Sequence, residues 1–366
     1  MCNSFVLMKF YLLFLGFCFV FEAHLQATLD WGIEMKPKFG FLLAQRGEVA
    51  HLPTSSAFGG EISFVIQTNG KKQWHQKYNY PTIGATFIGL SVGNKDVLGN
   101  FYGVYSFIEF PFIKTKKYQL TGKLGNGLGY GTKIYDPITN PKNSVVSTHL
   151  NALVCFGLQN RFTFNRSHFV LGVDMTHFSN GAFKVPNIGI NMPYISLGYG
   201  YRFKPQEKVT LFKSILPFKK ILYGLNLVYS HKEIFPTGQG KSKIYGVSAF
   251  ARYFFNSKMG TELSLDVISK QVIFKYKPEI IKNELDVVQI GIFAGFLLPL
   301  DRLHLVTGIG FYMKDKFQPE SFLYHRIGMR YYFDNGIHLN AVLRSNWAKA
   351  DFVEWGIGYT FNYKLR

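Results

Sequence analysis

The sequence predicts an all-β protein, an antiparallel transmembrane β-barrel of about 14 to 16 strands that follows a cleaved signal peptide. Three observations predict this class: long stretches of strict apolar and polar alternation, an unusual aromatic and glycine content, and the lack of a long apolar helix. Aromatic residues make up 17% of the chain, which also contains 36 glycines, yet the mean hydropathy is only +0.04. Aromatic girdles and glycine-rich strands are typical of barrels in lipid.

The N-terminus has the order of parts of a secretory signal peptide. Lys9 precedes an apolar run over residues 10–21, and Ala27 is a small residue of the kind found at a signal-peptide cleavage site. The run is too short for a membrane-spanning helix. We therefore expect a signal peptide at residues 1–27 and an outer-membrane β-barrel at residues 28–366.

The cysteines indicate neither a disulfide nor a metal site. Cys2 and Cys18 would leave with the signal peptide, so Cys155 would be alone in the mature chain. No Cys and His spacing of the zinc-binding kind occurs. We expect no metal and no cofactor.

Alternation with a period of two residues recurs along the whole mature chain. In the last segment, Val353, Trp355 and Ile357 share one face, whereas Glu354 and Gly356 occupy the other. Such a strand lies between two different environments, lipid on one side and water or a polar lumen on the other. The longest nearly apolar stretch, residues 287–300, falls short of the ~20 residues that a spanning helix needs.

The alternating segments predict sixteen strands, an even number that places both ends of the barrel on one side of the membrane. They lie near residues 31–44, 58–68, 82–93, 99–113, 117–131, 147–163, 167–179, 189–203, 219–232, 242–255, 259–270, 287–300, 303–314, 322–333, 336–346 and 351–363.

Short and long connections mostly alternate, as expected for inward turns and outward loops. Two connections, 69–81 and 204–218, are long where a short turn is expected. The second could be an interfacial amphipathic helix, or the strand count could be 14. We predict one barrel, with no second domain.

The formal net charge of +19 stays on the mature chain, because Lys9 and Glu22 cancel within the signal peptide. Such a charge favours an anionic partner. An exported chain meets anionic membrane lipid rather than nucleic acid, so we expect lipid as the partner. The alternative is that the excess lysines only solvate loops and turns.

One stretch carries residues suited to chemistry. His177 and Ser179 are two apart on the seventh predicted strand, so both side chains leave the same face. A hydroxyl beside an imidazole is the minimum for nucleophilic acyl transfer. The same row carries Val173 and Met175, so the pair lies at the end of the lipid-facing row, near the external leaflet. The alternative is a polar strand end at the membrane interface.

The next strand adds a third polar residue to this face. Hairpin pairing would bring Asn191 close to His177, and a polar trio that faces outer-leaflet lipid suggests a lipid substrate. Asp174 is the nearest acid, but its odd offset from His177 places it on the lumen face.

These residues resemble a known family. The run His177, Phe178, Ser179, Asn180 and Gly181, followed by Pro186, Asn187 and Gly189, is similar to the active-site signature of the PagL-type lipid A 3-O-deacylases, also called acyloxyacyl hydrolases. The resemblance implies that Ser179 is the nucleophile and His177 the base. It also implies that Asn180 helps to stabilise the oxyanion, with Gly181 and Asn187 as supporting members.

The sequence departs from the family in two respects. Asn191 occupies the position at which the family's prototypes have a Glu, and an amide can orient a histidine but cannot stabilise an imidazolium by charge. The prototypes are also compact eight-stranded barrels, about half as long, so the extra strands could form a pore. Alternation points Asn180 away from Ser179, so a turn at Asn180 and Gly181 would be needed to bring it round.

The sequence therefore predicts a serine esterase in the outer membrane of a Gram-negative bacterium. It would remove an ester-linked acyl chain from lipid A of lipopolysaccharide, with Ser179, His177 and Asn191 as its catalytic residues. The alternatives are a non-enzymatic channel or scaffold barrel whose motif is degenerate, and a soluble exported binding barrel.

Overall fold

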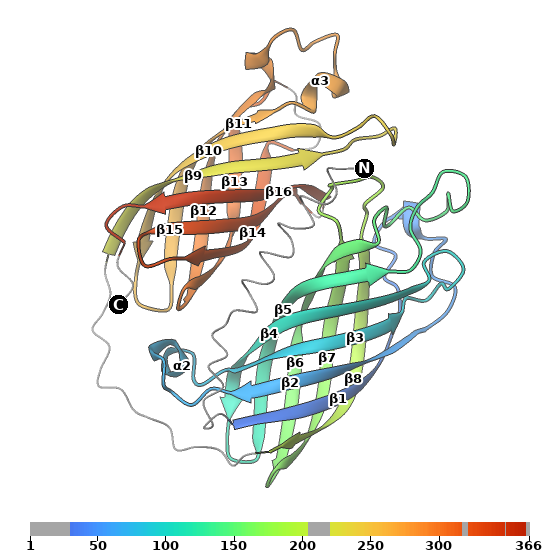
Figure 1. Ribbon diagram of the computed structural model, residues 1–366, viewed down its shortest axis with the longest axis vertical. Helices are drawn as coiled ribbons and strands as arrows, with labels where there is room; N and C mark the ends of the chain where they lie inside the picture. Colours follow the sequence, from blue (N-terminus) through green and yellow to red (C-terminus); the bar gives the residue numbers. More distant parts are fainter. Residues whose placement is uncertain (1–29, 204–219, 317–320, 348, 364–366) are drawn as a thin grey trace. The chain divides into compact units, whose positions relative to one another are not determined.

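The computed structural model describes residues 30–203, 220–316, 321–347 and 349–363. Within these ranges the chain forms sixteen strands (Figure 1). In chain order they are β1 (Asp30–Gly40), β2 (Ala57–Gln67), β3 (Thr82–Ser91), β4 (Asn100–Lys114), β5 (Tyr118–Gly131), β6 (Leu150–Phe164), β7 (Ser167–Ser179), β8 (Ile190–Arg202), β9 (Lys220–Lys232), β10 (Ser242–Phe254), β11 (Gly260–Lys270), β12 (Val288–Leu300), β13 (Leu303–Lys314), β14 (Leu323–Tyr332), β15 (Ile337–Asn346) and β16 (Lys349–Thr360).

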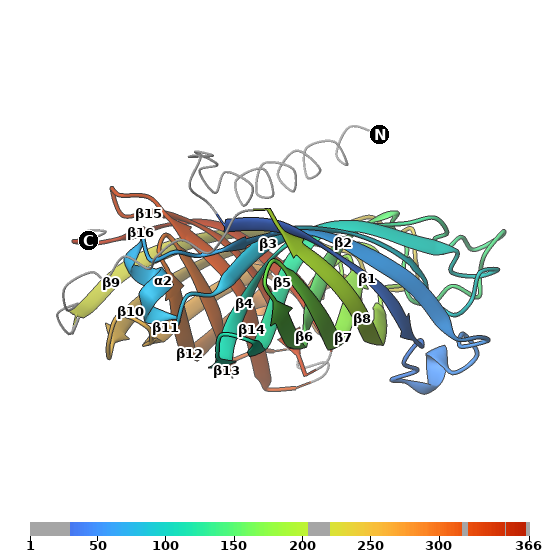
Figure 2. The same ribbon diagram turned by 90° about the horizontal axis from the view of Figure 1, so that it is seen from below.

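The strands close into two barrels, β1–β8 and β9–β16. All neighbouring strands in both are antiparallel. The first barrel closes where β1 pairs with β8, with Met35 opposite Tyr199. The second closes where β16 pairs with β9, with Ile357 opposite Leu227. Figures 1 and 2 show, from two directions, how the strands of each barrel tilt around its wall.

The predicted all-β barrel class and the sixteen strands are confirmed, but the strands do not form the single barrel expected over residues 28–366. Alternation identifies the two faces of each strand and says nothing about which strand closes on which. An eight-stranded barrel has an interior just wide enough for side chains to fill. In both barrels, the inward-facing charged side chains that the structure describes are buried, as expected for a lumen filled by side chains.

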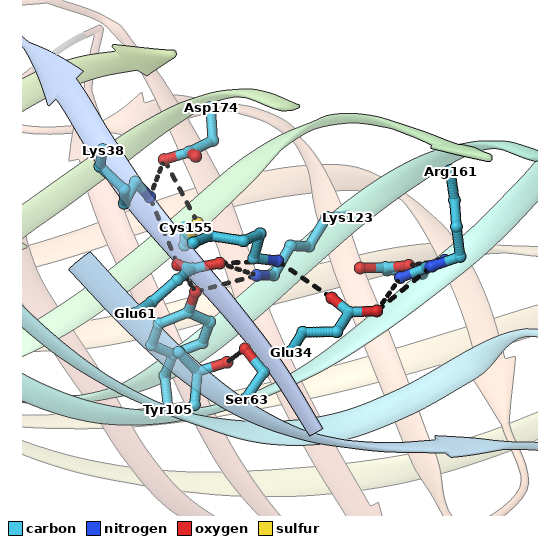
Figure 3. A network of polar contacts seen from close by, with 12 residues as sticks. Glu34, Lys38, Glu61, Ser63, Tyr105, Lys123, Cys155, Arg161 and Asp174 are labelled. Carbon is cyan, nitrogen blue, oxygen red and sulfur yellow. Dashed lines mark hydrogen bonds and ion pairs between the residues drawn. The ribbon is translucent and has the colours of Figure 1, made fainter. Parts of the chain in front are cut away.

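Charged side chains fill the first lumen (Figure 3). Glu61 accepts hydrogen bonds from four groups, Lys36 at 2.8 Å, Lys123 at 3.2 Å, Lys38 at 3.4 Å and the Tyr105 hydroxyl at 2.8 Å. Arg161 bridges Glu34 at 2.7 Å and Glu109 at 2.9 Å. Because an unpaired buried charge is very costly, these opposite charges must be matched within the lumen.

In the second lumen the buried carboxylates are paired mainly with arginines. Asp266 accepts from Arg326 at 2.9 Å and from Arg344 at 3.1 Å. Glu262 binds Arg330 and Arg252. Arg326 and Arg330, which a pore would expose to passing ions, are thus buried and paired with carboxylates. The pore that the chain length suggested has no counterpart in the described part of this lumen.

The outward-facing rows are apolar in both barrels. In the first barrel, Val173 on β7 and Leu197 on β8 are exposed, and in the second Leu227 on β9 and Leu265 on β11 are exposed. Among the residues that the structure describes, no helix is both long and apolar enough to span a membrane.

The connections confirm the alternation of tight turns and long loops. The exception at residues 69–81 contains a short helix, α2 (Gln73–Lys77). Among the long loops, the first carries η1 (Gly47–Val49), and the β11–β12 loop carries α3 (Ile273–Tyr276) and η2 (Glu284–Val287). The exception at 204–218 and the signal peptide at 1–27 lie outside the described residues. In sequence, the 204–218 connection separates the strands of the two barrels.

Candidate active site

The outer end of the β7–β8 hairpin brings together the three predicted catalytic residues. Ser179 Oγ lies 2.9 Å from His177 Nε2. On the other side of the imidazole ring, His177 Nδ1 lies 2.6 Å from Asn191 Oδ1. Because an amide oxygen can only accept, Nδ1 must carry the proton, which leaves the Nε2 lone pair facing the serine hydroxyl. This is the tautomer that a general base requires.

Strand register and alternation explain why the three side chains meet. His177 is paired directly with Asn191 across the hairpin, and side chains of such a pair lie on the same face. Between His177 and Ser179, Phe178 points into the lumen, where it is fully buried and packs on Phe101 with ring centroids 4.9 Å apart. This inward anchor holds the last residues of β7 in register, so Ser179 and His177 share the outward row.

A fourth residue, not expected from the sequence, joins this arrangement. Asn191 Nδ2 donates a hydrogen bond to Gln45 Oε1. Gln45 follows β1, which pairs with β8 only because the first barrel closes after eight strands. The hydrogen-bonded line therefore runs from Ser179 through His177 and Asn191 to Gln45, and it contains no charged group.

A turn directly after Ser179 changes the direction of the chain at the position where the role of Asn180 would need it. Gly181 has a φ of 64° and Ala182 a φ of 63°. The Asn180 backbone N–H donates to Asn187 Oδ1 at 2.9 Å, and Asn180 Nδ2 donates to the Lys184 carbonyl at 3.0 Å. Asn180 and Asn187 thus brace the loop that follows the serine, and the assignment of Asn180 to the oxyanion stays a prediction.

Gly189 packs against the site from the other end of this loop. Its φ is +82°, and a Cβ built on it would lie 2.8 Å from His177 Cε1 and 3.4 Å from Ser179 Cβ. Its backbone N–H donates to the Val145 carbonyl at 3.0 Å, which ties it to the β5–β6 loop. Only glycine fits both the backbone conformation and the close approach to the imidazole.

Asp174, the nearest acid in sequence, lies in the lumen as expected. Its Oδ1 accepts from Lys38 at 2.7 Å and from Thr176 at 3.0 Å. It therefore belongs to the ion-pair network of the lumen and does not contact the imidazole. In the described ranges, no group of His, Cys, Asp and Glu is arranged to hold a metal ion.

Two family models match the chain. The model described as "Lipid A 3-O-deacylase (PagL)" matches residues 58–202, and the one described as "Acyloxyacyl hydrolase, C-terminal domain" matches residues 221–363. The chain belongs to the PagL family of acyloxyacyl hydrolases. The two matches fall one on each barrel, so the division seen in the structure is also a division between two PagL family domains, and the candidate site lies in the first of them.

Other comparisons add little to the family assignment. No curated protein matches the chain. Solved structures that resemble it include engineered variants of the Rh. blastica porin, with 10% identity and a TM-score of 0.18 for one and 9% and 0.19 for another. A triple mutant of the Rhodopseudomonas blastica porin has 9% identity and a TM-score of 0.18. Each alignment covers 91% of this chain and all of the porin. TM-scores this low support no statement about fold or function.

Proposed function

We propose that this protein is an outer-membrane serine esterase that removes an ester-linked acyl chain from lipid A. The observation that carries the proposal is the hydrogen-bonded line of Ser179, His177 and Asn191 on the outward face of the barrel wall. A nucleophile, a base and an orienting group in this order are the parts that acyl transfer needs. Their position on an apolar outer face suits a substrate whose ester lies within the lipid.

The proposed reaction has two halves. Ser179 Oγ attacks the ester carbonyl while His177 Nε2 accepts the hydroxyl proton, and the tetrahedral intermediate collapses when this proton passes to the leaving sugar oxygen. Water then attacks the acyl-enzyme, with His177 again acting as base, and releases the fatty acid and the free serine. Asn191 holds the imidazole through Nδ1, and no metal or cofactor takes part.

The oxyanion of the intermediate must be stabilised by N–H donors. We assign this role to Asn180, with the backbone at Gly181 and the loop brace at Asn187 in support. The Asn180 side chain donates to Lys184 in this conformation, so productive binding requires its amide to turn or to use its second N–H.

The test is mass spectrometry of lipid A after incubation with the refolded full-length protein. We expect the loss of one acyl mass, and a fall of at least about 10³-fold in rate for Ser179→Ala and for His177→Ala. Ser106→Ala is the matched control, because Ser106 lies on β4 of the same barrel and alternation places it in an outward-facing row. It should retain full activity.

A different outcome would favour the non-enzymatic alternative. Unchanged lipid A in the presence of correctly folded protein would indicate a scaffold barrel with a degenerate site, in which the amide at Asn191 does not support catalysis. Equal loss of activity in Ser106→Ala and Ser179→Ala would show that the two substitutions act on folding rather than on chemistry.

A further inference from the structure

An amide at the third triad position creates a problem that a carboxylate does not have. Both oxygens of a carboxylate accept hydrogen bonds, so either can face the imidazole. The Asn191 amide has one acceptor end and one donor end. If it turned over, its NH₂ group would face His177 Nδ1, the imidazole proton would move to Nε2, and the lone pair needed by Ser179 would be lost.

The cost of the wrong tautomer is known from serine protease triads. Replacing the triad Asp by Asn there lowers kcat about 10⁴-fold, although the geometry is intact. A working site with Asn191 therefore requires a group that holds the amide oxygen toward His177. Such a group must accept a hydrogen bond from Asn191 Nδ2.

Gln45 is that group in the structure, since its Oε1 accepts from Asn191 Nδ2. We propose that Gln45 is a positioning residue, which fixes the orientation of the Asn191 amide and through it the tautomer of His177. The inference rests on the proposed esterase function for its consequence in catalysis. It also makes a statement about the imidazole that can be measured without turnover.

Backbone contacts hold Gln45 in place. After β1 ends, the chain continues along β8, because Leu43 N donates to the Asn191 carbonyl at 2.9 Å and Phe41 N to the Pro193 carbonyl at 3.4 Å. Gln45 N then donates back to the Leu43 carbonyl at 3.0 Å. The backbone of Leu43 is thus bonded to the same asparagine whose side chain Gln45 contacts.

The first experiment compares substitutions at Gln45 that differ in hydrogen bonding. Gln45→Glu can only accept and should keep kcat close to that of the unmodified protein. Gln45→Leu can neither accept nor donate and should lower kcat about tenfold. Gln45→Lys can only donate, which favours the reversed amide, and should lower kcat about 100-fold. KM for lipid A should change little in all three.

The second experiment repeats the series in an Asn191→Asp background. A carboxylate has no reversed state, so Gln45→Leu should now change kcat less than about threefold. Gln45→Lys should leave kcat unchanged or raise it in this background, because the lysine charge lies beside the new carboxylate. Equal losses in the two backgrounds, or a Gln45→Lys variant no worse than Gln45→Leu, would overturn the assignment, since a purely structural role predicts those results.

The third measurement separates this inference from the proposed function. ¹⁵N NMR of histidine-labelled full-length protein, with His177→Gln to assign the signal, reports which ring nitrogen carries the proton. We expect the Nδ1–H tautomer in the unmodified protein and a shift toward Nε2–H in Gln45→Lys. If lipid A is not cleaved but this shift occurs, the esterase proposal fails and the positioning role stands. If cleavage occurs without the shift, the positioning role fails.

Discussion

The two barrels share a strand number and a filled lumen but differ in the residues that fill it. The first matches Glu61 with lysines, whereas the second matches Asp266 with arginines and, among its described lumen residues, only Asp351 with lysines. An ammonium is a compact point charge, and a guanidinium is a planar group with five fixed donors. Two different sets of ion pairs therefore neutralise the buried charges of the two lumens, and neither set takes part in the proposed reaction.

The outer faces differ in a more consequential way. At the outer end of the β7–β8 hairpin, His177 lies opposite Asn191. At the same place in the second barrel, the β15–β16 hairpin pairs Leu343 with Val353. The lumen therefore stabilises each barrel, whereas a few outward residues at the end of one hairpin determine whether a barrel has a candidate active site.

The largest expected effect is on stability. Glu61→Ala leaves buried ammonium groups without a counter-charge and should destabilise the first barrel by about 3–5 kcal/mol. Glu262→Ala should do the same to the second barrel while deacylation by folded protein stays unchanged. Urea titration followed by tryptophan fluorescence can separate the two in variants that keep tryptophan in one barrel only, Trp31 and Trp74 in the first or Trp347 and Trp355 in the second. Equal shifts of both barrels in either variant would contradict the independence of the lumens.

A charge on the outer face tests whether both barrels contact lipid. Leu197 is 63% exposed in the first barrel and Leu227 is 56% exposed in the second. Leu197→Arg and Leu227→Arg should each oppose folding into lipid vesicles, by about 2–4 kcal/mol near the bilayer midplane. The control is Ile138→Arg, in a loop of the first barrel where Ile138 is 87% exposed. If only one of the two barrel variants folds poorly, only that barrel faces lipid.

Substitution of Gly189 tests the site without touching a catalytic group. Gly189→Ala would place a methyl group against the His177 ring and strain the backbone, so we expect kcat to fall about 100-fold. Gly238→Ala in the second barrel is the matched control. Gly238 also has a positive φ, but a Cβ there meets nothing within 4 Å. Steady-state kinetics that show similar losses in both would attribute the effect to backbone strain alone.

The smallest expected effect on activity comes from Asp174. Asp174→Asn removes the charge that faces Lys38 and should lower the stability of the first barrel by about 1–3 kcal/mol. The rate of deacylation by folded protein should change less than about twofold, because the side chain lies inside the wall. A loss as large as that of His177→Ala would identify Asp174 as the acid of the triad.

Local pattern was sufficient to predict the strands and the proximity of Ser179, His177 and Asn191. Alternation identified all sixteen strands within a few residues, and the same parity placed His177 and Ser179 outward and Asp174 inward. Hairpin pairing then placed Asn191 beside His177, because β7 and β8 are neighbours in sequence. Each of these inferences depends on residues that are close along the chain.

Closure of the barrel could not be predicted in this way. In one sixteen-stranded barrel, β1 would pair with β16, and Gln45 would lie far from Asn191. Only the pairing of β1 with β8 brings them together. These two strands are distant along the chain, and their pairing produces no periodic pattern in the sequence. Two signals were present: the long connection at 204–218, and the apolar row of Phe39, Phe41 and Leu43 that continues to Gln45.

The outward position of Ser179 has a consequence for how such an enzyme meets its substrate. Under the proposed function, the substrate has neither to enter a lumen nor to leave the membrane, so enzyme and substrate would meet by diffusion within the plane of the membrane. The relevant concentration is then the mole fraction of lipid A in the leaflet, not its amount per volume of solution. Dilution of the leaflet with inert lipid should slow turnover, whereas dilution of the whole suspension with buffer should leave turnover per enzyme molecule unchanged.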